Sequence, residues 1–252
     1  MATRPAWQGF DYDRVDVGDY DALRPDYAPE SVDWMIRTAE LSDRSPVIEL
    51  AAGTGKLTRL LVTASLSVVA LEPSARMRKV LSRRAGHAVV TAGRAEKIPA
   101  GAGSFEAVLV AQAFHHFDAE RAAAEILRVL RPRGALCLFW TAYDEGDPVK
   151  GALDEVYARF GDPATSARMG SWRERFAATG LFVKVEEASF PHPHTIASSA
   201  LSRLYATSSD VASLPPARRR PLLTAIDQLG RRLPERVSIG ASTFVELYRG
   251  RR

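Results

Sequence analysis

The sequence predicts an α/β fold built on a doubly wound, mostly parallel sheet of seven strands. Two observations carry this prediction. Between residues 45 and 140, five short apolar runs alternate with segments whose apolar residues recur every three or four positions. The runs are apolar along their whole length, as expected for strands that helices cover on both faces. A chain of 252 residues can build one substantial core, and we expect a single domain over residues 1–252.

The first five strands and the helices between them have definite expected places. The apolar runs predict strands at Val47–Leu50, Val68–Leu71, Ala88–Thr91, Ala107–Val110 and Ala135–Phe139. The three-to-four spacing predicts helices at Lys56–Thr63, Ser74–Arg84 and Asp118–Leu130. Pro132-Arg133-Gly134 is expected to stop the last of these helices before the fifth strand.

Two strands and three helices are predicted in the second half of the chain. The strands are expected at Phe182–Ser189 and Ser242–Tyr248. The helices are expected at Trp172–Thr179, Ile196–Val211 and, after the break at Pro215-Pro216, Arg218–Arg232. The last two form a helical insertion before the final strand, within residues 190–235, and we expect it to be a lid or a wall for a substrate.

Composition narrows the class of protein. The formal net charge of +4 is spread along the chain, and the densest basic run, Arg218-Arg219-Arg220, lacks interleaved aromatic residues, so no nucleic acid partner is expected. Cys137 is the only cysteine, and no metal site is expected. The N-terminus is too acidic and polar for a signal peptide, and no apolar run approaches the ~20 residues that cross a bilayer. We therefore expect a cytoplasmic protein without a membrane partner, a monomer or weak homodimer, and the excess of arginine over lysine favours a bacterial origin.

The stretch SPVIELAAGTGKLTRLL, residues 45–61, points to a bound ligand. Gly53 and Gly55 follow the first strand and precede a helix, and without a Cβ they let the main chain turn sharply against a ligand. The helix start adds exposed N–H donors and partial positive charge, which suit a carboxylate or a phosphate.

An acid at the end of the second strand narrows the ligand to a nucleoside. Glu72 can accept hydrogen bonds from both hydroxyl groups of a ribose. The dinucleotide fingerprint would require a third glycine at position 58, which is Thr58, and the phosphate-binding loop of nucleotide hydrolases is also absent. The pattern therefore favours a nucleoside cofactor, while two loop glycines beside a surface acid are the structural alternative.

Four ordered segments carry a resemblance to a known family: VIELAAGTGKLT, VVALEPSARM, AGRAEKIPAGAGSFEAVLVAQAFHHFD and ILRVLRPRGALCLFW. They resemble the motifs of class I S-adenosylmethionine-dependent methyltransferases, of the branch related to ubiquinone/menaquinone C-methyltransferases and trans-aconitate methyltransferase. The resemblance covers about residues 10–145. It implies a Rossmann-like methyltransferase fold that binds S-adenosyl-L-methionine and releases S-adenosyl-L-homocysteine. YDALRPDYAPE is similar to the segment that these enzymes fold over the cofactor, so residues 1–44 are expected to cover it and residues 45–145 to bind it.

The resemblance also implies roles for individual residues. Glu49 would organise the glycine turn, Gly53 and Gly55 would admit the methionyl portion, and Glu72 would bind the ribose. Further cofactor contacts are implied at Tyr20, Arg24, Thr54, Pro73, Met77, Ala95, Glu96, Gln112, Ala113 and His115. Among these, Tyr20 and Arg24 would close the site, with the Arg24 guanidinium beside the cofactor carboxylate.

Two positions depart from the family pattern. Ala51 stands where the family usually has its first glycine, and because alanine disfavours positive φ, ordinary backbone angles are expected there. Arg94 stands where an acid often meets the adenine amino group, so that contact should be lost or supplied elsewhere. Both positions remain expected cofactor neighbours.

His115 and His194 are the candidate catalytic bases. Imidazole titrates near neutrality, which suits a group that removes a proton from a methyl acceptor. A helix cap or packing against the cofactor is the alternative for His115 and His116. Tyr143 and its two acidic neighbours could bind a substrate or form a polar turn, and the pair His192 and His194 lacks a third metal ligand.

The predicted function is methylation of a small-molecule acceptor, with oxygen favoured over nitrogen and carbon and a carboxylate among the candidates. The insertion at Thr195–Arg232 should form the acceptor cavity, with Arg203 as a partner for an anion. The alternatives are a catalytically silent S-adenosylmethionine-binding regulator or scaffold, or an enzyme of the same fold that catalyses a non-methylating reaction. An RNA or protein methyltransferase would require an extended basic face, and a nicotinamide oxidoreductase fails on the glycine spacing.

Overall fold

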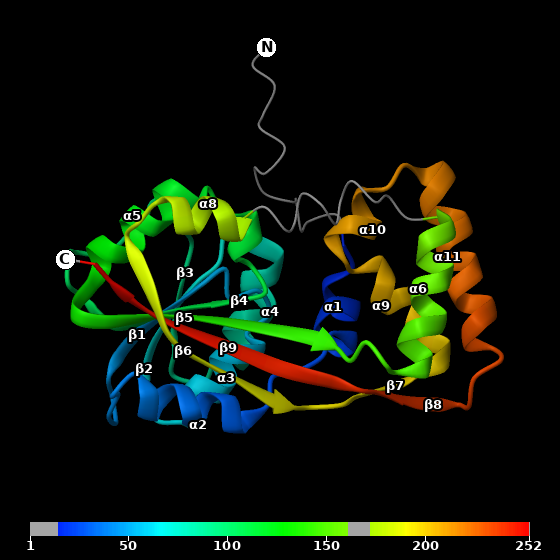
Figure 1. Cartoon of the computed structure of the whole chain (residues 1–252), viewed down its shortest axis with the longest axis horizontal. Coiled ribbons are helices and arrows are strands. Elements are labelled where there is room, and N and C mark those ends of the chain that lie inside the picture. The colour runs from blue at the N-terminus through cyan, green and yellow to red at the C-terminus, as the bar shows by residue number, and fades with distance from the viewer. Residues whose placement is uncertain (1–14, 161–171, 252) are drawn as a thin grey trace, which may run out of the picture.

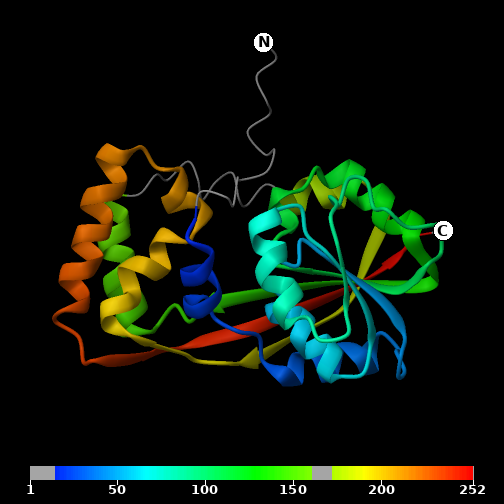
Figure 2. The same ribbon diagram turned by 180° about the vertical axis from the view of Figure 1, so that it is seen from behind.

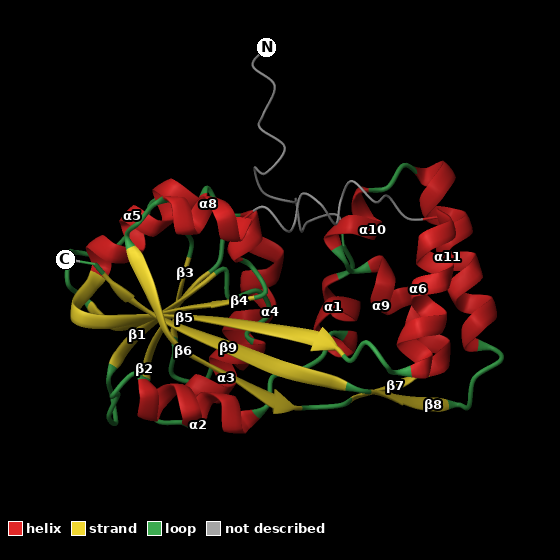
Figure 3. Ribbon diagram, in the orientation of Figure 1, coloured by secondary structure: helices red, strands yellow, loops and turns green. Residues whose placement is uncertain are grey.

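The computed structural model describes residues 15–160 and 172–251. These residues form a sheet covered by helices on both faces, together with a cap of helices (Figures 1 and 3). In Figure 1 the sheet lies on the left, and the carboxyl end of β5 points toward the cap on the right. None of the helices in these ranges combines the length and the apolar character that crossing a bilayer requires.

The strands of the sheet follow the order β3-β2-β1-β4-β5-β9-β6. Neighbours from β3 to β5 pair in parallel, whereas β9 is antiparallel to both β5 and β6. The predicted doubly wound, mostly parallel seven-stranded sheet is therefore confirmed. The strands span Pro46–Leu50 (β1), Ser67–Leu71 (β2), Val89–Thr91 (β3), Phe105–Ala111 (β4), Leu130–Tyr143 (β5), Phe182–Pro191 (β6) and Ala241–Gly250 (β9). The order reverses between β1 and β4, and ligands of such sheets bind at this switch point, beyond the carboxyl ends of the strands.

Two apolar cores lie on opposite faces of the sheet. Side chains of β1 alternate between them, because Val47 and Ile48 point to opposite faces of the strand. One face is covered by α2, α3 and α4 and the other by α5 and α8. These helices span Pro29–Thr38 (α2), Lys56–Thr63 (α3), Ala75–Arg84 (α4), Ala119–Val129 (α5) and Trp172–Ala178 (α8). The bounds of α3 agree with the prediction residue for residue.

The entry into β5 differs from the expected helix stop. Helix α5 ends at Val129, and Leu130 already pairs with Phe105. A register shift in the β4–β5 ladder follows, and it absorbs residues 131–134 of the strand. Because a proline cannot donate to a ladder, a bulge of this kind is where a strand tolerates Pro132. Pro132-Arg133-Gly134 therefore lies in an irregular stretch of β5 and does not end a helix.

The cap contains a helix that the sequence pattern did not predict. Helix α6, Pro148–Phe160, packs against α11, Pro216–Gly230, in the cap core. Its start has a clear local cause, because the Asp147 carboxylate accepts the main-chain N–H groups of Val149 and Lys150. An acid followed by a proline at the first helical position is a start signal that could have revealed this helix.

The predicted helix at Ile196–Val211 is wrong as a continuous element. The segment begins in strand β7, His194–Ala197, which pairs with β8, Arg236–Ile239. It continues through a 3₁₀ turn into two short helices, Leu201–Ala206 (α9) and Ser209–Ser213 (α10). The hydroxyl groups of Thr207 and Ser208 donate to carbonyls three residues earlier, and such local bonds compete with a regular helix and separate α9 from α10.

Helix α1, Val17–Leu23, lies between the sheet and the cap. It contacts α4 on one side and α9 on the other, and the view from behind shows it standing in this position (Figure 2). The Asp21 carboxylate forms an ion pair with Arg84 of α4, and Asp19 forms one with Arg203 of α9. The residues expected to cover a cofactor therefore join both parts of the molecule.

Candidate functional site

The glycine turn lies at the switch point of the sheet, between β1 and α3. Gly53 and Gly55 both adopt left-handed backbone angles, with φ of +59° and +89°. A Cβ on Gly55 would also lie 2.6 Å from the Leu81 side chain. The turn thus depends on glycine for its conformation and its packing, and it leaves the main chain bare at the start of α3.

Glu72 is joined to this turn by hydrogen bonds from the main chain. The Gly53 N–H donates to Oε2 over 2.9 Å, and the Ser74 N–H donates to Oε1 over 2.8 Å. The side chain is buried. Each carboxylate oxygen can accept more than one hydrogen bond, so Glu72 retains capacity for the two hydroxyl groups of a ribose.

The expected ordinary backbone at Ala51 is wrong. Its φ is +53°, in the left-handed region, and Gln112 at the end of the neighbouring strand β4 has a φ of +54°. A non-glycine residue in this region costs about 1–2 kcal/mol. The Ala52 N–H donates to the Leu71 carbonyl of β2, and the Gln112 N–H donates to the Phe139 carbonyl of β5. The chain is therefore tied to the neighbouring strands directly beside both strained positions, on either side of the switch point.

Glu49 organises the turn from beneath it. The carboxyl group is buried and accepts a hydrogen bond from the Thr58 hydroxyl in the first turns of α3. Burial raises the pKa of Glu49 to about 8, although the Thr58 hydrogen bond lowers it, and the nearby Glu72 adds to the rise. Glu49 is therefore mostly protonated at neutral pH, and it can donate a hydrogen bond as well as accept one.

A small pocket opens beside the glycine turn. Its lining includes Thr54, whose buried hydroxyl oxygen has no hydrogen-bond partner within the described residues. Tyr20, Tyr27 and Lys56 also line it. An unpartnered hydroxyl costs about 1–3 kcal/mol when buried, so it fits a site that a polar ligand group completes. The main chain is bare at the glycine turn, and the Glu72 carboxylate is held against it by the Gly53 N–H. Together with the Thr54 hydroxyl, these groups fit S-adenosylmethionine.

Tyr27 and Lys56 are pocket residues that the sequence analysis did not single out. Tyr27 packs edge-on against Phe139 of β5, with ring centroids 6.1 Å apart. Its neighbour Ala28 is fixed by a main-chain N–H that donates to the Thr243 hydroxyl of β9. Lys56 forms an ion pair with Asp26 over 2.8 Å. Tyr27 could have been found, because it lies in the segment YDALRPDYAPE that resembles a cofactor cover.

Tyr20 and Arg24 lie together at the end of α1. The Arg24 guanidinium carbon lies 5.5 Å from the centre of the Tyr20 ring, and its Nε donates to the Thr207 hydroxyl of the cap over 2.9 Å. Burial raises the pKa of Tyr20, Arg24 lowers it, and Glu72 raises it further. Tyr20 is therefore within electrostatic reach of Glu72, as a closing residue would be, and stays protonated.

The loop after β3 carries the expected adenine neighbours. Ala95 is buried, and Glu96 accepts the main-chain N–H of Asp118 over 3.0 Å. The Arg94 side chain is mostly exposed and lies 3.7 Å from the Glu96 carboxylate. Arg94 thus pairs with its own loop at the surface, as expected for a residue that cannot accept a bond from an adenine amino group.

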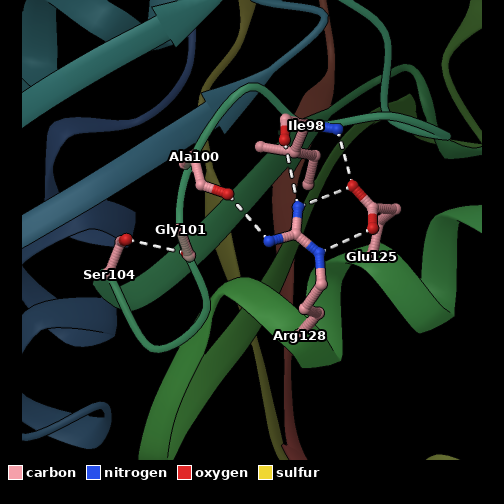
Figure 4. A network of polar contacts seen from close by, with 6 residues as sticks. All are labelled: Ile98, Ala100, Gly101, Ser104, Glu125 and Arg128. Atoms are coloured by element: carbon pink, nitrogen blue, oxygen red, sulfur yellow. Dashed lines mark hydrogen bonds and ion pairs between the residues drawn. The ribbon is translucent and has the colours of Figure 1, made fainter.

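One arginine holds this loop from α5 (Figure 4). Arg128 donates to the carbonyls of Ala100 and Ile98, over 2.7 Å and 3.0 Å, and to both oxygens of Glu125. Glu125 in turn accepts the Ile98 N–H over 2.7 Å. The figure shows the guanidinium between the loop and the helix, where three hydrogen bonds join the loop to α5 and two more join Arg128 to Glu125 within the helix.

His115 lies after β4 as a half-buried, neutral ring. Burial lowers its pKa to about 4, and its Nδ1 has no hydrogen-bond partner within the described residues. The rings of His116 and Trp140 lie 3.9 Å and 5.7 Å away. Ala113 is buried just before it, and the Gln112 side chain donates to the Thr141 carbonyl. His115 is therefore available to accept a hydrogen bond and is uncharged at neutral pH.

Pro73 and Met77 are two further expected cofactor neighbours, and they differ in burial. Pro73 is exposed at the surface. Met77 is buried against Val15, Val17 and Ala212, where α4 meets α1 and the cap. Met77 thus packs beneath the covering helix, and a role toward the cofactor stays a prediction for both residues.

The structure joins His194 to Tyr143 across the gap between sheet and cap. The Tyr143 hydroxyl, at the end of β5, lies 2.7 Å from Nδ1 of His194 on β7. Burial lowers the pKa of His194, and burial raises that of Tyr143 to about 12. His194, the second candidate base, and Tyr143 therefore form one hydrogen-bonded unit. Sequence spacing could not reveal this contact.

Arg203 does not face an acceptor, which corrects an expectation. Its guanidinium makes a two-pronged contact with the Asp19 carboxylate of α1, and its side chain is 61% exposed. The arginine therefore ties the cap to α1 at the surface. His192 also lies outside the unit, and its main-chain N–H pairs with Ala241 in the sheet.

Comparisons with known proteins found methyltransferases among the similar sequences and structures. A family model described as a methyltransferase domain matches residues 48–138. An uncharacterized methyltransferase of Mycobacterium tuberculosis is 38% identical over 84% of this chain and 83% of its own length. An uncharacterized methyltransferase-like protein of Schizosaccharomyces pombe is 31% identical over 88% of this chain and 86% of its own length. Among solved structures, a candidate type II methyltransferase from Anaeromyxobacter dehalogenans superposes with a TM-score of 0.68 at 23% identity, over 91% of this chain and 98% of that chain.

Proposed function

Because the chain belongs to the class I S-adenosylmethionine-dependent methyltransferases, we propose that it methylates an oxygen of a small molecule bound between the sheet and the cap. One observation carries the proposal. The pocket beside Gly53 is lined in part by Tyr20 of α1, and α1 packs against α9 of the cap, so an acceptor that reaches the pocket could also contact the cap.

Residues of the chain divide the work of binding. The start of α3 and the Thr54 hydroxyl would hold the methionyl portion, with the Arg24 guanidinium beside its carboxylate. Glu72 would hold the ribose, and the loop at Ala95 and Glu96 would lie beside the adenine. When bound, the cofactor supplies a methyl group on a positively charged sulfur.

Positioning is the main task of the protein in such a displacement. The acceptor oxygen must be held in line with the methyl group, at a near-attack distance of about 3–3.5 Å. Tyr20 and Tyr27 close the pocket from the α1 side and exclude water from it. His115, neutral and unpartnered at Nδ1, offers one hydrogen-bond acceptor at the carboxyl end of β4.

The enclosed arrangement supports a small acceptor over a macromolecule. The cap core continues from α6 through α9 to α11, and its aromatic residues face inward. We also propose that the protein acts without a nucleic acid or membrane partner, as a monomer or weak homodimer in the cytoplasm. The branch of quinone and trans-aconitate methyltransferases remains the proposed position within the family.

Methyl-labelled S-adenosylmethionine tests the proposal directly. The protein is incubated with the labelled cofactor and separately with the small-molecule, RNA and protein fractions of a bacterial extract. We expect label in the small-molecule fraction, attached through oxygen as shown by mass spectrometry. Label confined to RNA or protein would contradict the small-molecule acceptor, and binding of the cofactor without any transfer would favour a regulatory or scaffolding role.

A further inference from the structure

We propose that Tyr143 and His194 form a proton-accepting pair for the methyl acceptor, and that the acceptor is a neutral hydroxyl compound of the phenol class. The inference rests on the proposed function and deepens it. It starts from the 2.7 Å contact between the Tyr143 hydroxyl and His194 Nδ1. This contact joins the end of β5 to β7 of the cap.

Tyr143 lies on the sheet face that carries the cofactor pocket. Strand residues two apart share a face, so Phe139, Thr141 and Tyr143 point the same way. The register places Phe139 beside Ala111, which lines the pocket, and Tyr27 packs on the Phe139 ring. A continuous wall therefore runs along β5 from the pocket to the Tyr143 hydroxyl.

Thr141 adds an open polar group to this wall. Its buried hydroxyl oxygen has no hydrogen-bond partner within the described residues. It stands between Phe139 and Tyr143 on the same face. A second ligand besides the cofactor would satisfy this group, which lies on β5 between Phe139 beside the pocket and the Tyr143–His194 pair.

Electrostatic reach connects the pair to the cofactor residues. The charge of Arg24 lowers the pKa values of Tyr20, Tyr143 and His194 alike. The Arg24 guanidinium carbon lies 5.5 Å from the centre of the Tyr20 ring, and the Tyr143 hydroxyl lies 2.7 Å from His194. The pair is thus near the residues expected to close the cofactor site.

The hydrogen bonds set the direction of proton movement. A main-chain hydrogen bond with Leu23 favours the charged form of the His194 ring, which is the effect of a carbonyl that accepts a ring N–H. In the tautomer whose ring proton faces Leu23, Nδ1 would accept the Tyr143 proton. The Tyr143 oxygen keeps lone pairs free for a hydroxyl group of the acceptor.

The charges facing His194 come from three places. Lys56 of α3 and Arg24 lower its pKa, and Asp26 raises it, while burial is the largest cause and lowers it. His194 is therefore neutral at neutral pH and can accept a proton. Lys56 lines the cofactor pocket, and Asp26 forms an ion pair with it.

Methylation of a hydroxyl oxygen requires that its proton leave. The acceptor oxygen forms a bond to the methyl carbon while the carbon–sulfur bond breaks and its electron pair leaves with sulfur. The acceptor proton passes to the Tyr143 oxygen as the Tyr143 proton passes to His194 Nδ1. The imidazolium then loses its proton to water, and the neutral pair is restored.

The class of acceptor follows from charge and shape. A carboxylate acceptor would need a free cation and no base, yet Lys56 pairs with Asp26 and Arg203 pairs with Asp19. Arg24 is the expected partner of the cofactor carboxylate. Tyr143, Tyr157, Tyr205 and Phe160 are partly buried against the cap core, and their exposed parts would form an aromatic wall for the acceptor. A neutral ring that bears a hydroxyl group fits such a wall and requires a base.

Binding of 4-nitrophenol tests the pair without turnover. With S-adenosylhomocysteine present no methyl can move, and the ionised phenol is distinguished by its yellow absorption. We expect the wild type to shift bound 4-nitrophenol toward the ionised form, and His194→Gln and Tyr143→Phe to abolish the shift. His192→Gln, a histidine change two residues away, should leave it intact. Bound 4-nitrophenol that stays un-ionised in the wild type would overturn the pair, whether or not any variant folds.

Transfer rates to ring-substituted phenols give the second readout. With un-ionised phenols, His194→Gln should lower kcat about 100-fold, the usual contribution of a positioned base. With phenols already ionised at the assay pH, the loss should be less than about threefold, because no proton has to leave. Equal losses across the series would show a structural role and contradict the inference.

Three outcomes separate this inference from the proposed function. If the wild type binds S-adenosylmethionine by calorimetry but neither binds nor methylates any phenol, the acceptor class is wrong. If transfer to phenols proceeds equally in all variants, the pair is wrong while the function stands. If the cofactor itself does not bind, the proposed function fails.

Discussion

The main-chain N–H of Gly53 donates to Oε2 of Glu72 over 2.9 Å, so the turn after β1 and the acid after β2 form one connected unit. The two residues belong to parallel neighbours in the sheet, whose carboxyl ends meet at one edge. The bond fixes the carboxylate before any ligand arrives. A ribose would therefore meet an acid that has already lost its rotational freedom, which lowers the entropic cost of binding.

Glu72→Gln should weaken binding of S-adenosylmethionine by about 1–3 kcal/mol, the scale of hydrogen bonds to a charged group. Glutamine keeps the shape of the side chain but offers one acceptor oxygen where the carboxylate offers two. Isothermal titration calorimetry measures the change. Glu187→Gln, an exposed acid on β6, is the matched control and should bind as the wild type does. An unchanged dissociation constant in Glu72→Gln would refute the ribose assignment.

Ala51→Gly should raise the free energy of unfolding by roughly 0.5–1 kcal/mol. Glycine relieves the strain of a φ of +53°, about 1–2 kcal/mol, and part of that gain is offset by its greater freedom in the unfolded chain. Urea denaturation followed by circular dichroism measures the difference. Ala64→Gly, at a φ of −79°, should instead destabilise the protein by a similar amount. If both changes destabilise equally, Ala51 is not strained.

Stability should fall as the pH drops from 6.5 toward 4, in part because of His115. Burial holds its pKa at about 4 in the folded chain, so between these values the unfolded chain binds a proton that the folded chain does not. The cost is on the order of 2 kcal/mol for this partly exposed ring. His115→Gln should reduce the slope of unfolding free energy against pH, as measured by urea titrations at several pH values. His87→Gln, an exposed histidine, should preserve the slope.

Arg128→Lys should loosen the loop at Ile98 and Ala100, which would lie beside the adenine. Lysine cannot replace a guanidinium that bonds two carbonyls and a carboxylate at once, so a loss of about 1–2 kcal/mol of stability is expected. Hydrogen exchange should quicken at the Ile98 amide and its neighbours in the loop. Arg121→Lys, on the same helix, serves as the control. Unchanged exchange in Arg128→Lys would mean that the network does not hold the loop.

The elements that the sequence predicted best are those with complete local signals. Helix α3 has a glycine before it, an apolar stripe and a short loop after it, and its bounds agree with the prediction. The errors lie where tertiary contacts override local pattern. Ile196 belongs to a strand because β8 supplies its hydrogen-bond partners, and Pro132 sits in a strand because a bulge accommodates it. Neither partner can be identified from the segment itself.

The residues of the candidate site also divide into those that local sequence signals predicted and those that only tertiary contacts reveal. The cradle could be predicted, because Gly53, Gly55 and Glu72 follow consecutive parallel strands and must meet at one edge of the sheet. Arg203 was misassigned because the position of α1, with Asp19 beside it, is not encoded near residue 203. Tyr27 lies in a segment that the sequence marked as a cofactor cover, but its place in the pocket depends on packing against Phe139 of β5, far away in the chain.

The sequence alone predicted the class of fold and a nucleoside cofactor, since apolar periodicity, glycine spacing and the place of an acid are local properties of a strand and the turn that follows it. The resemblance to a known family then implied which nucleoside cofactor it is. Only the tertiary structure decided that Tyr143 meets His194. The Tyr143 hydroxyl and the His194 ring belong to different sheets, 51 residues apart, and come within 2.7 Å because the end of β5 meets the cap. A contact of that kind depends on how two packed units orient each other, and no spacing within the chain expresses it.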